Sequence, residues 1–238
     1  MAGHSKWKSI KHKKAIADSK RGKSFTKLIK EITIAARSGG GDPSGNPRLR
    51  TLLDKAKEIN MPLENSQRAI KKGTGELPGV SYEQYMYEGY GPGNIAVLIE
   101  VLTDNKNRAI ADLRALFTRR GGILAESGAV SWMFHKLGVI RVNKANTSED
   151  QLVETLLEYE VKDIKLEEDV FEITCDPRQL EEIKNILTKL HLKVESAEVE
   201  WVAQNTLLLE GDTEEKAHEF LSALEDLEDV QNVYTNLE

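Results

Sequence analysis

The stretch that decides the fold runs from residue 139 to residue 201 and reads VIRVNKANTSEDQLVETLLEYEVKDIKLEEDVFEITCDPRQLEEIKNILTKLHLKVESAEVEW. Runs rich in Val and Ile at 139–142, 164–166, 170–174 and 194–201 predict four strands. Leucines and isoleucines recur at helical spacing between the first two runs and again between the last two, which predicts two helices. The order is strand, helix, strand, strand, helix, strand, so we expect a ferredoxin-like unit.

Both helices of this unit carry a start signal. Ser148 and Gln151 have the spacing of a capping box, in which each side chain satisfies a backbone N–H of the first turn. Asp176 followed by Pro177 predicts the cap and the first position of the second helix. Cys175, the one cysteine of the chain, ends the preceding strand and is expected to be a small buried residue. A single cysteine excludes an internal disulfide and a cysteine-cluster metal site.

The segments on either side of this unit each read as strand, helix, strand. We expect these elements at 95–102, 107–119 and 130–134 before it, and at 206–209, 217–224 and 230–234 after it. Joined together, the two flanks make a second ferredoxin-like unit. The economical interpretation is one α/β domain, 80–136 and 204–238, split by an inserted α/β domain, 137–203. The alternative is three sequential domains, the last of which is small for independent stability.

The first 79 residues have a different pattern, that of a basic arm followed by three helices. Apolar residues from Phe25 to Ala36 recur at helical spacing and predict a helix over 23–38. Asn46 and Pro47 are expected as the N-cap and first position of the next helix. Pro62 is expected to start a third helix, which Gly73 ends. The fold class is therefore α+β and multidomain: an N-terminal three-helix domain, then two ferredoxin-like α/β domains, one inserted in the other.

The net charge of −6 conceals a strong division along the chain. Residues 1–75 hold 18 Lys+Arg and 6 Asp+Glu, whereas residues 145–238 hold 7 and 26. The stretch between them is nearly neutral. Charge asymmetry of this size indicates separate functional surfaces.

Positive charge is densest in residues 1–30, where Lys and Arg outnumber acids 10 to 1. A surface that serves only solubility mixes both signs, whereas a polyanion relieves uncompensated positive charge and releases its own counterions. An anionic membrane is less favoured, because the apolar face of the 23–38 helix is needed for the helical core. The candidate nucleic-acid-binding residues are Lys6, Trp7, Lys8, Lys11, His12, Lys13, Lys14, Lys20, Arg21, Lys23, Lys27, Lys30, Arg37, Arg48 and Arg50.

Helical geometry separates the candidates of the 23–38 helix from its apolar stripe. At 100° per residue, Lys23, Lys27, Lys30 and Arg37 fall on the face opposite that stripe and are expected to face solvent. Trp7 has two open interpretations, stacking on a base or packing back on the helices. The last basic cluster, at residues 68–72, either extends the phosphate-binding face or is simply exposed.

Nothing in the sequence assembles a catalytic or metal site. The five histidines do not fall at ligand spacing on one element, and no nucleophile elbow is present. The glycine-rich loop 89–94 precedes a strand, which is the wrong order for a dinucleotide-binding loop. We therefore expect no enzyme, no cofactor and no metal. Without an apolar run of roughly 20 residues or a secretory signal, a cytoplasmic monomer is expected.

Several long motifs together resemble those of the YebC/PmpR family. They are residues 1–7, 20–23, 39–43, 46–50, 87–92 and 102–108, which read MAGHSKW, KRGK, GGGDP, NPRLR, YEGYGP and LTDNKNR. The resemblance implies three domains, one inserted in another. It implies a transcriptional regulator that binds DNA through its basic N-terminal domain.

The same resemblance keeps a second function open. The mitochondrial relative of the family is a translational activator of cytochrome c oxidase, and bacterial members are linked to ribosomes stalled on proline runs. The alternative is therefore a ribosome-associated, RNA-binding translation factor. The expected partners are DNA or ribosomal RNA, and the acidic α/β domains are candidates for contact with basic proteins.

Overall fold

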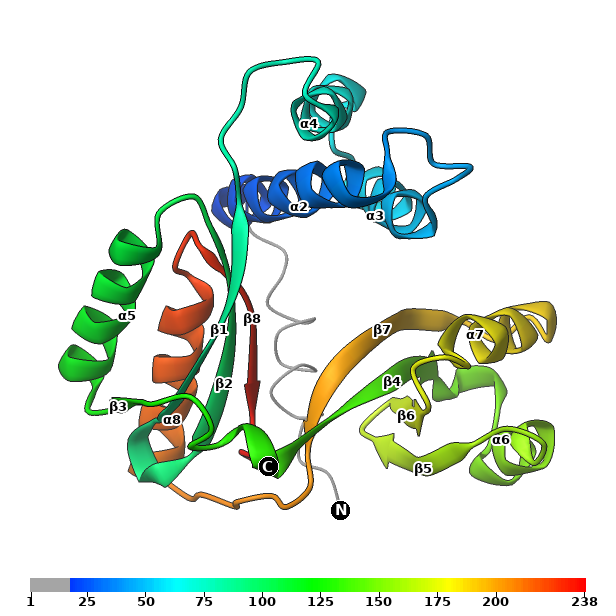
Figure 1. Ribbon diagram of the computed structural model, residues 1–238. Helices are drawn as coiled ribbons and strands as arrows, with labels where there is room; N and C mark the ends of the chain where they lie inside the picture. The colour runs from blue at the N-terminus through cyan, green and yellow to red at the C-terminus, as the bar shows by residue number, and fades with distance from the viewer. Residues whose placement is uncertain (1–17) are drawn as a thin grey trace.

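A computed structural model describes residues 18–238, with side chains from residue 22 onward except that of Asn146. This part of the chain forms seven α-helices and two four-stranded antiparallel sheets (Figure 1). Three helices come first, and two domains that each contain a sheet follow. The predicted α+β fold class is confirmed. No helix of residues 18–238 combines the length and the apolarity needed to cross a bilayer.

The N-terminal helices are α2 (Asp18–Gly39), α3 (Pro47–Glu58) and α4 (Leu63–Thr74). Their shared core includes Leu28 and Ile32 of α2, Leu49 and Leu52 of α3, and Ala69 of α4, all of them buried. Burial of a large apolar side chain contributes roughly 1.5–3 kcal/mol. The three helices therefore form a core of their own.

Asn46 connects two of these helices and confirms the predicted cap of α3. Its Oδ1 accepts a hydrogen bond from the Leu49 N–H, while its Nδ2 donates to the carbonyls of Ala35 and Gly40 at 2.8 and 2.9 Å. The predicted stop at Gly73 is wrong. α4 continues to Thr74 and ends at Gly75, whose φ of 84° suits glycine.

The sheet of the split domain contains β1 (Glu83–Tyr90), β2 (Ala96–Thr103), β3 (Ile123–Ala125) and β8 (Val230–Thr235), in the order β3-β1-β2-β8. Two helices, α5 (Lys106–Arg120) and α8 (Asp212–Glu225), pack on one face of this sheet. β8 pairs with β2 although about half of the chain lies between them. The sheet therefore includes strands from both sides of the inserted unit.

Two expected strands of this domain are wrong. The apolar residues 206–209 make only an isolated bridge, Leu207 with Leu237, and Leu207 packs instead at the edge of the core. The place of that strand is taken by β1, which the sequence pattern does not assign and which lies between β3 and β2. Residues 130–134 contain a 3-10 turn, Ser131–Met133, because the chain leaves one sheet for the other there. The sheet keeps the ferredoxin-like strand order with its third strand supplied from the N-terminal side.

The inserted sheet contains β4 (Phe134–Asn143), β5 (Val161–Glu167), β6 (Val170–Cys175) and β7 (Val194–Ala203), in the order β5-β6-β4-β7. α6 (Glu149–Leu156) and α7 (Leu180–Lys189) cover one face. This is the strand–helix order expected for the stretch 139–201, and the remaining short elements are 3-10 turns at Pro92–Asn94 and Lys144–Asn146.

The two helix start signals of this unit have different outcomes. The capping box of Ser148 and Gln151 is present with both of its hydrogen bonds. The cap expected at Asp176 is wrong, because α7 begins at Leu180 and Asp176 instead accepts a hydrogen bond from the Arg178 N–H at 2.8 Å. Cys175 is buried, and burial raises its thiol pKa to about 11, which is consistent with a packing role.

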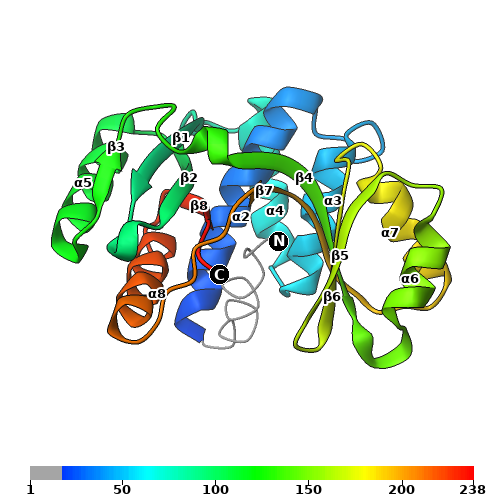
Figure 2. The same ribbon diagram turned by 90° about the horizontal axis from the view of Figure 1, so that it is seen from below.

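The N-terminal helices bridge the two sheet-containing domains. Figure 1 shows the N-terminal helices lying above both sheets, and Figure 2 shows the same helices between the two domains when the molecule is seen from below. Lys23 of α2 contacts Asp226 of the split domain, and Lys55 of α3 contacts Glu198 of the inserted domain. The basic region is therefore held against both acidic domains.

Candidate nucleic-acid interface

Most of the candidate residues lie outside the part of the chain that the structure describes. Lys6, Trp7, Lys8, Lys11, His12, Lys13 and Lys14 precede residue 18, and the side chains of Lys20 and Arg21 are likewise outside it. The structure describes the side chains of Lys23, Lys27, Lys30, Arg37, Arg48 and Arg50. It brings the first four of these together along α2 and puts the other two on α3.

Lys30 is the clearest departure from the sequence prediction. The helical spacing predicts that it faces solvent, but it is 3% exposed, and its Nζ lies 2.6 Å from Asp229 Oδ1. The same ammonium donates to the carbonyls of Glu228 and Leu102 at 3.2 and 3.4 Å. The prediction of a solvent-facing Lys30 is wrong because the split domain covers this side of α2, and helical spacing does not report such a neighbour. We therefore assign Lys30 to the contact between domains.

Asp229 is the centre of this buried contact. Besides Lys30, it accepts hydrogen bonds from Thr103 Oγ1 at 2.9 Å and from Arg108 Nη2 at 2.8 Å. Burial raises the pKa of Asp229, but the hydrogen bonds from Lys30, Arg108 and Thr103 outweigh it and lower the pKa below its ordinary value. Asn105 caps α5 by accepting from the Arg108 N–H, so the motif at residues 102–108 builds this site.

The other candidates of α2 also contact the split domain or the linker before it. Lys23 forms an ion pair with Asp226 at 3.0 Å, and Lys27 donates to the carbonyl of Glu225 at 2.9 Å. Arg37 donates to Ser81 Oγ at 2.7 Å. Lys23 and Arg37 remain exposed, so phosphate contact by them stays a prediction. A pair as exposed as Lys23–Asp226 contributes at most about 1 kcal/mol.

α3 and α4 carry several exposed cations. Arg48 and Arg50 flank the buried Leu49, and both are exposed. Arg68, Lys71 and Lys72 are exposed positions of α4. None of the three α4 residues forms an ion pair within residues 22–238. These five side chains, which we call the outer cations, are exposed to solvent, and one of them, Arg50, also lines the cavity described next.

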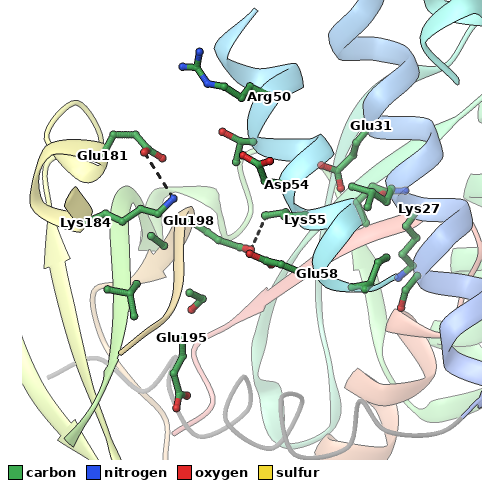
Figure 3. A pocket seen from close by; sticks show the side chains of 18 of the residues that line it. Lys27, Glu31, Arg50, Asp54, Lys55, Glu58, Glu181, Lys184, Glu195 and Glu198 are labelled. Carbon is green, nitrogen blue, oxygen red and sulfur yellow. Dashed lines mark hydrogen bonds and ion pairs between the residues drawn. The ribbon is translucent and has the colours of Figure 1, made fainter. Parts of the chain in front are cut away.

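A cavity of about 1000 Å³ lies between α2, α3, α7 and β7. Figure 3 shows acidic and basic side chains around it, among them Glu31, Lys55 and Glu198. Acidic residues outnumber basic ones in its lining, eight to six. The described lining therefore carries a net negative charge, and we call this cavity the cleft.

Glu31 and Lys55 define the electrostatics of the cleft. Lys55 Nζ lies 2.7 Å from Glu198 Oε1 and joins the N-terminal helices to the inserted domain (Figure 3). Burial raises the pKa of Glu31, and Glu100 and Glu198 raise it further, although Lys55 and Arg48 oppose the shift. The interior of the cleft therefore holds more negative charge than its cations neutralise.

The motif at residues 87–94 has a structural role that the sequence does not reveal. Glu88 is 4% exposed, and its carboxylate accepts hydrogen bonds from the N–H groups of Gly128, Val130 and Ser131 at 2.7–2.8 Å. Burial alone would raise the pKa of Glu88, but these hydrogen bonds lower it. A Cβ on Gly89 would lie 2.5 Å from the Phe117 ring, so only glycine fits. The loop therefore has a structural role. Within the described residues, no group of three or more His, Cys, Asp or Glu side chains could hold a metal ion.

Known proteins match the chain along its length. The profile of the TACO1/YebC protein N-terminal domain matches residues 5–76, and that of the TACO1/YebC second and third domain matches residues 82–237. A "Probable transcriptional regulatory protein" of Desulfatibacillum aliphaticivorans is 54% identical, over 99% of this chain and 96% of its own. A protein of the same name from Geotalea uraniireducens is 53% identical, over 100% and 96%.

A solved structure agrees with these matches. The crystal structure of a conserved hypothetical protein from Aquifex aeolicus is 46% identical, has a TM-score of 0.85, and covers 96% of this chain and 95% of its own. The family resemblance seen in the motifs is confirmed, and the relatives carry the names of regulators rather than of enzymes. From the two profiles and these relatives, the chain belongs to the TACO1/YebC family.

Proposed function

We propose that this protein is a regulatory protein that binds nucleic acid through its basic N-terminal region, and that it acts on DNA as a transcriptional regulator. The observation that carries the proposal is the segregation of charge: 18 Lys+Arg against 6 Asp+Glu in residues 1–75, in a chain of net charge −6. The exposed outer cations of α3 and α4 support it. The names of the relatives in Desulfatibacillum aliphaticivorans and Geotalea uraniireducens agree with a role in transcription.

The geometry favours contacts with phosphate over the reading of bases. α2 is the longest helix of residues 18–238, and the contacts of Lys23, Lys27 and Lys30 hold one side of it against the split domain. That side cannot enter a major groove. Phosphate contacts fix the position of a protein on a duplex and carry no sequence information, so modest sequence preference is expected.

The acidic domains orient the complex. The last third of the chain carries 26 Asp+Glu against 7 Lys+Arg, and this charge repels a polyanion. Because the N-terminal helices are fixed to both domains, the arm and the outer cations can approach DNA while the acidic surfaces face away.

The test measures binding of the full chain to a promoter duplex and to a scrambled duplex over a range of salt concentrations. The variant Arg68→Gln/Lys71→Gln/Lys72→Gln should weaken binding to both duplexes and reduce the salt slope by about one for each phosphate that the variant no longer binds. The matched control is Lys162→Gln/Lys189→Gln/Lys216→Gln, which removes the same charge from exposed sites of the acidic domains. Equal effects of the two triple variants would contradict a role for the outer cations, and equal affinity for the two duplexes would contradict sequence-specific regulation.

RNA binding on the ribosome is the second candidate, and the docking of α2 favours it. Exposed cations beside an α2 that the split domain holds on one side suit RNA, which proteins recognise largely by shape and backbone when it is double-stranded. This function predicts that the chain cosediments with ribosomes and that removal of residues 1–30 abolishes cosedimentation. Absence of the full chain from the ribosomal fraction at low salt would count against it.

A further inference from the structure

One face of the inserted sheet is buried although no helix of residues 18–238 belongs to its apolar cluster. α6 and α7 pack on the opposite face, together with Ile140 and Ile173. On the near face, Leu137, Val139 and Val202 form a separate cluster of strand residues only, and they are 8%, 0% and 4% exposed. Arg141, Glu172 and Glu200 lie on the same side of the strands, are 4%, 2% and 1% exposed, and form buried ion pairs beside this cluster.

Part of this face carries acidic side chains and lines the cleft. Leu137 and Val139 are the register partners of Glu200 and Glu198, and directly opposed residues of an antiparallel pair point to the same side. Glu198 lines the cleft, in which acids outnumber bases eight to six. A ligand of the cleft therefore meets acidic side chains close to this apolar cluster.

The lining of the cleft also contains buried polar atoms that have no hydrogen-bond partner among the described residues. Gln231 is 7% exposed and lines the cleft, yet neither atom of its side-chain amide has a hydrogen-bond partner among the described residues. Within the same part of the chain, Ser196 Oγ, buried in the same lining, has none either. Leaving such buried groups unpaired destabilises the protein, which favours a ligand that supplies donors and acceptors.

We propose that the ligand of the cleft is the basic arm of the same chain, residues 1–17, and that nucleic acid competes with the cleft for the arm. The inference rests on the proposed role of the arm in nucleic-acid binding. The sequence of the arm has five lysines interspersed with Trp7, Ile10 and Ile16, so it offers both the charge and the apolar groups that this face requires.

The place where the described chain begins supports this assignment. α2 starts at Asp18, and Lys23 and Ser24 near its start line the cleft. Seventeen residues can span up to about 56 Å, at roughly 3.3 Å per residue, so the whole cleft is within reach. A tethered segment acts at an effective concentration in the millimolar range, against which an untethered basic protein would have to compete.

The first experiment detects the contact without nucleic acid. The full chain is treated with a carbodiimide, which joins a lysine directly to a carboxylate that it touches, and the products are mapped by mass spectrometry. We expect links within one molecule between lysines 6–14 and Glu58, Glu195 or Glu198, and we expect duplex DNA to suppress them. Links to acids elsewhere, or links only between molecules, would overturn the proposal.

The second experiment measures competition. Glu58→Gln/Glu195→Gln removes two acids from the cleft, while the matched control Glu154→Gln/Glu158→Gln removes two exposed acids in and just after α6. The cleft variant should bind DNA about 2- to 5-fold more tightly than the control. Equal affinities would overturn the competition. If the arm crosslinks to the cleft while the chain binds neither DNA nor RNA, the proposed function fails and the docking of the arm stands.

Discussion

The negative charge of Glu31 destabilises the folded state. Its pKa is raised chiefly by burial, so the folded protein binds a proton more readily than the unfolded chain does. Stability therefore falls as pH rises above the ordinary value of 4.5, and the fall is complete once pH exceeds the pKa of the folded state. We predict that Glu31→Gln raises the melting temperature at pH 7 and that the gain disappears below pH 4.5. Glu64→Gln, at an exposed position of α4, is the control, and an equal gain there would contradict the prediction.

The charge of Lys30, in contrast, stabilises the folded state. Its ammonium and Asp229 are 4% and 8% exposed, so removing either one leaves a buried charge with fewer partners. We predict that Lys30→Met lowers the free energy of unfolding by about 3 kcal/mol. Lys57→Met should change it by less than about 1 kcal/mol, because the pair of Lys57 with Asp54 is 78% and 59% exposed. Denaturant unfolding of both variants measures the difference, and similar decreases would show that burial of the pair does not matter.

At the scale of elements, the hydrogen bonds of Glu88 hold residues 128–131 against the end of β1. We predict that Glu88→Gln destabilises the protein by about 1–3 kcal/mol, because one amide oxygen replaces two carboxylate oxygens and an N–H now faces the donors. Hydrogen exchange should quicken at the amides of Val130 and Ser131 before other amides of the split domain. Unchanged protection there would mean that other contacts hold the loop.

The sequence predicts a structural feature well where the residues that form it lie close together in the chain. The cap at Asn46 and the capping box at Ser148 depend on residues three positions away, and both are confirmed. The buried state of Lys30 depends on Asp229, 199 residues further on, which no helical spacing contains. β1 escapes prediction because its sequence, EQYMYEGY, has no clear apolar alternation and becomes a strand through its pairing with β2. Residues 206–209 resemble a strand, although they make only one isolated bridge.

At the scale of the whole molecule, contacts between residues far apart in the sequence also decide which part of the candidate interface is accessible. The division of charge is visible in the sequence and points to the N-terminal region. Which cations stay accessible depends on how the domains dock, and this contact occupies Lys30 while it leaves Arg68, Lys71 and Lys72 exposed. The cleft could not be predicted at all, because its walls come from helices and strands more than one hundred residues apart.

The pairing of β4 with β7 has a consequence for the order of folding. Phe134 and Ala203 are register partners, so the chain enters and leaves the inserted domain through adjacent strands. Once this ribbon forms, the loop that must close before β2 meets β8 becomes shorter by the length of that domain, and its entropic cost falls. We predict that in pulsed-labelling refolding experiments amides of β4 and β6 acquire protection before those of β8. Simultaneous protection would show that the split domain folds independently of the inserted domain. The predicted order means that the inserted domain folds before the sheet of the split domain is complete, although three strands of that sheet come earlier in the chain.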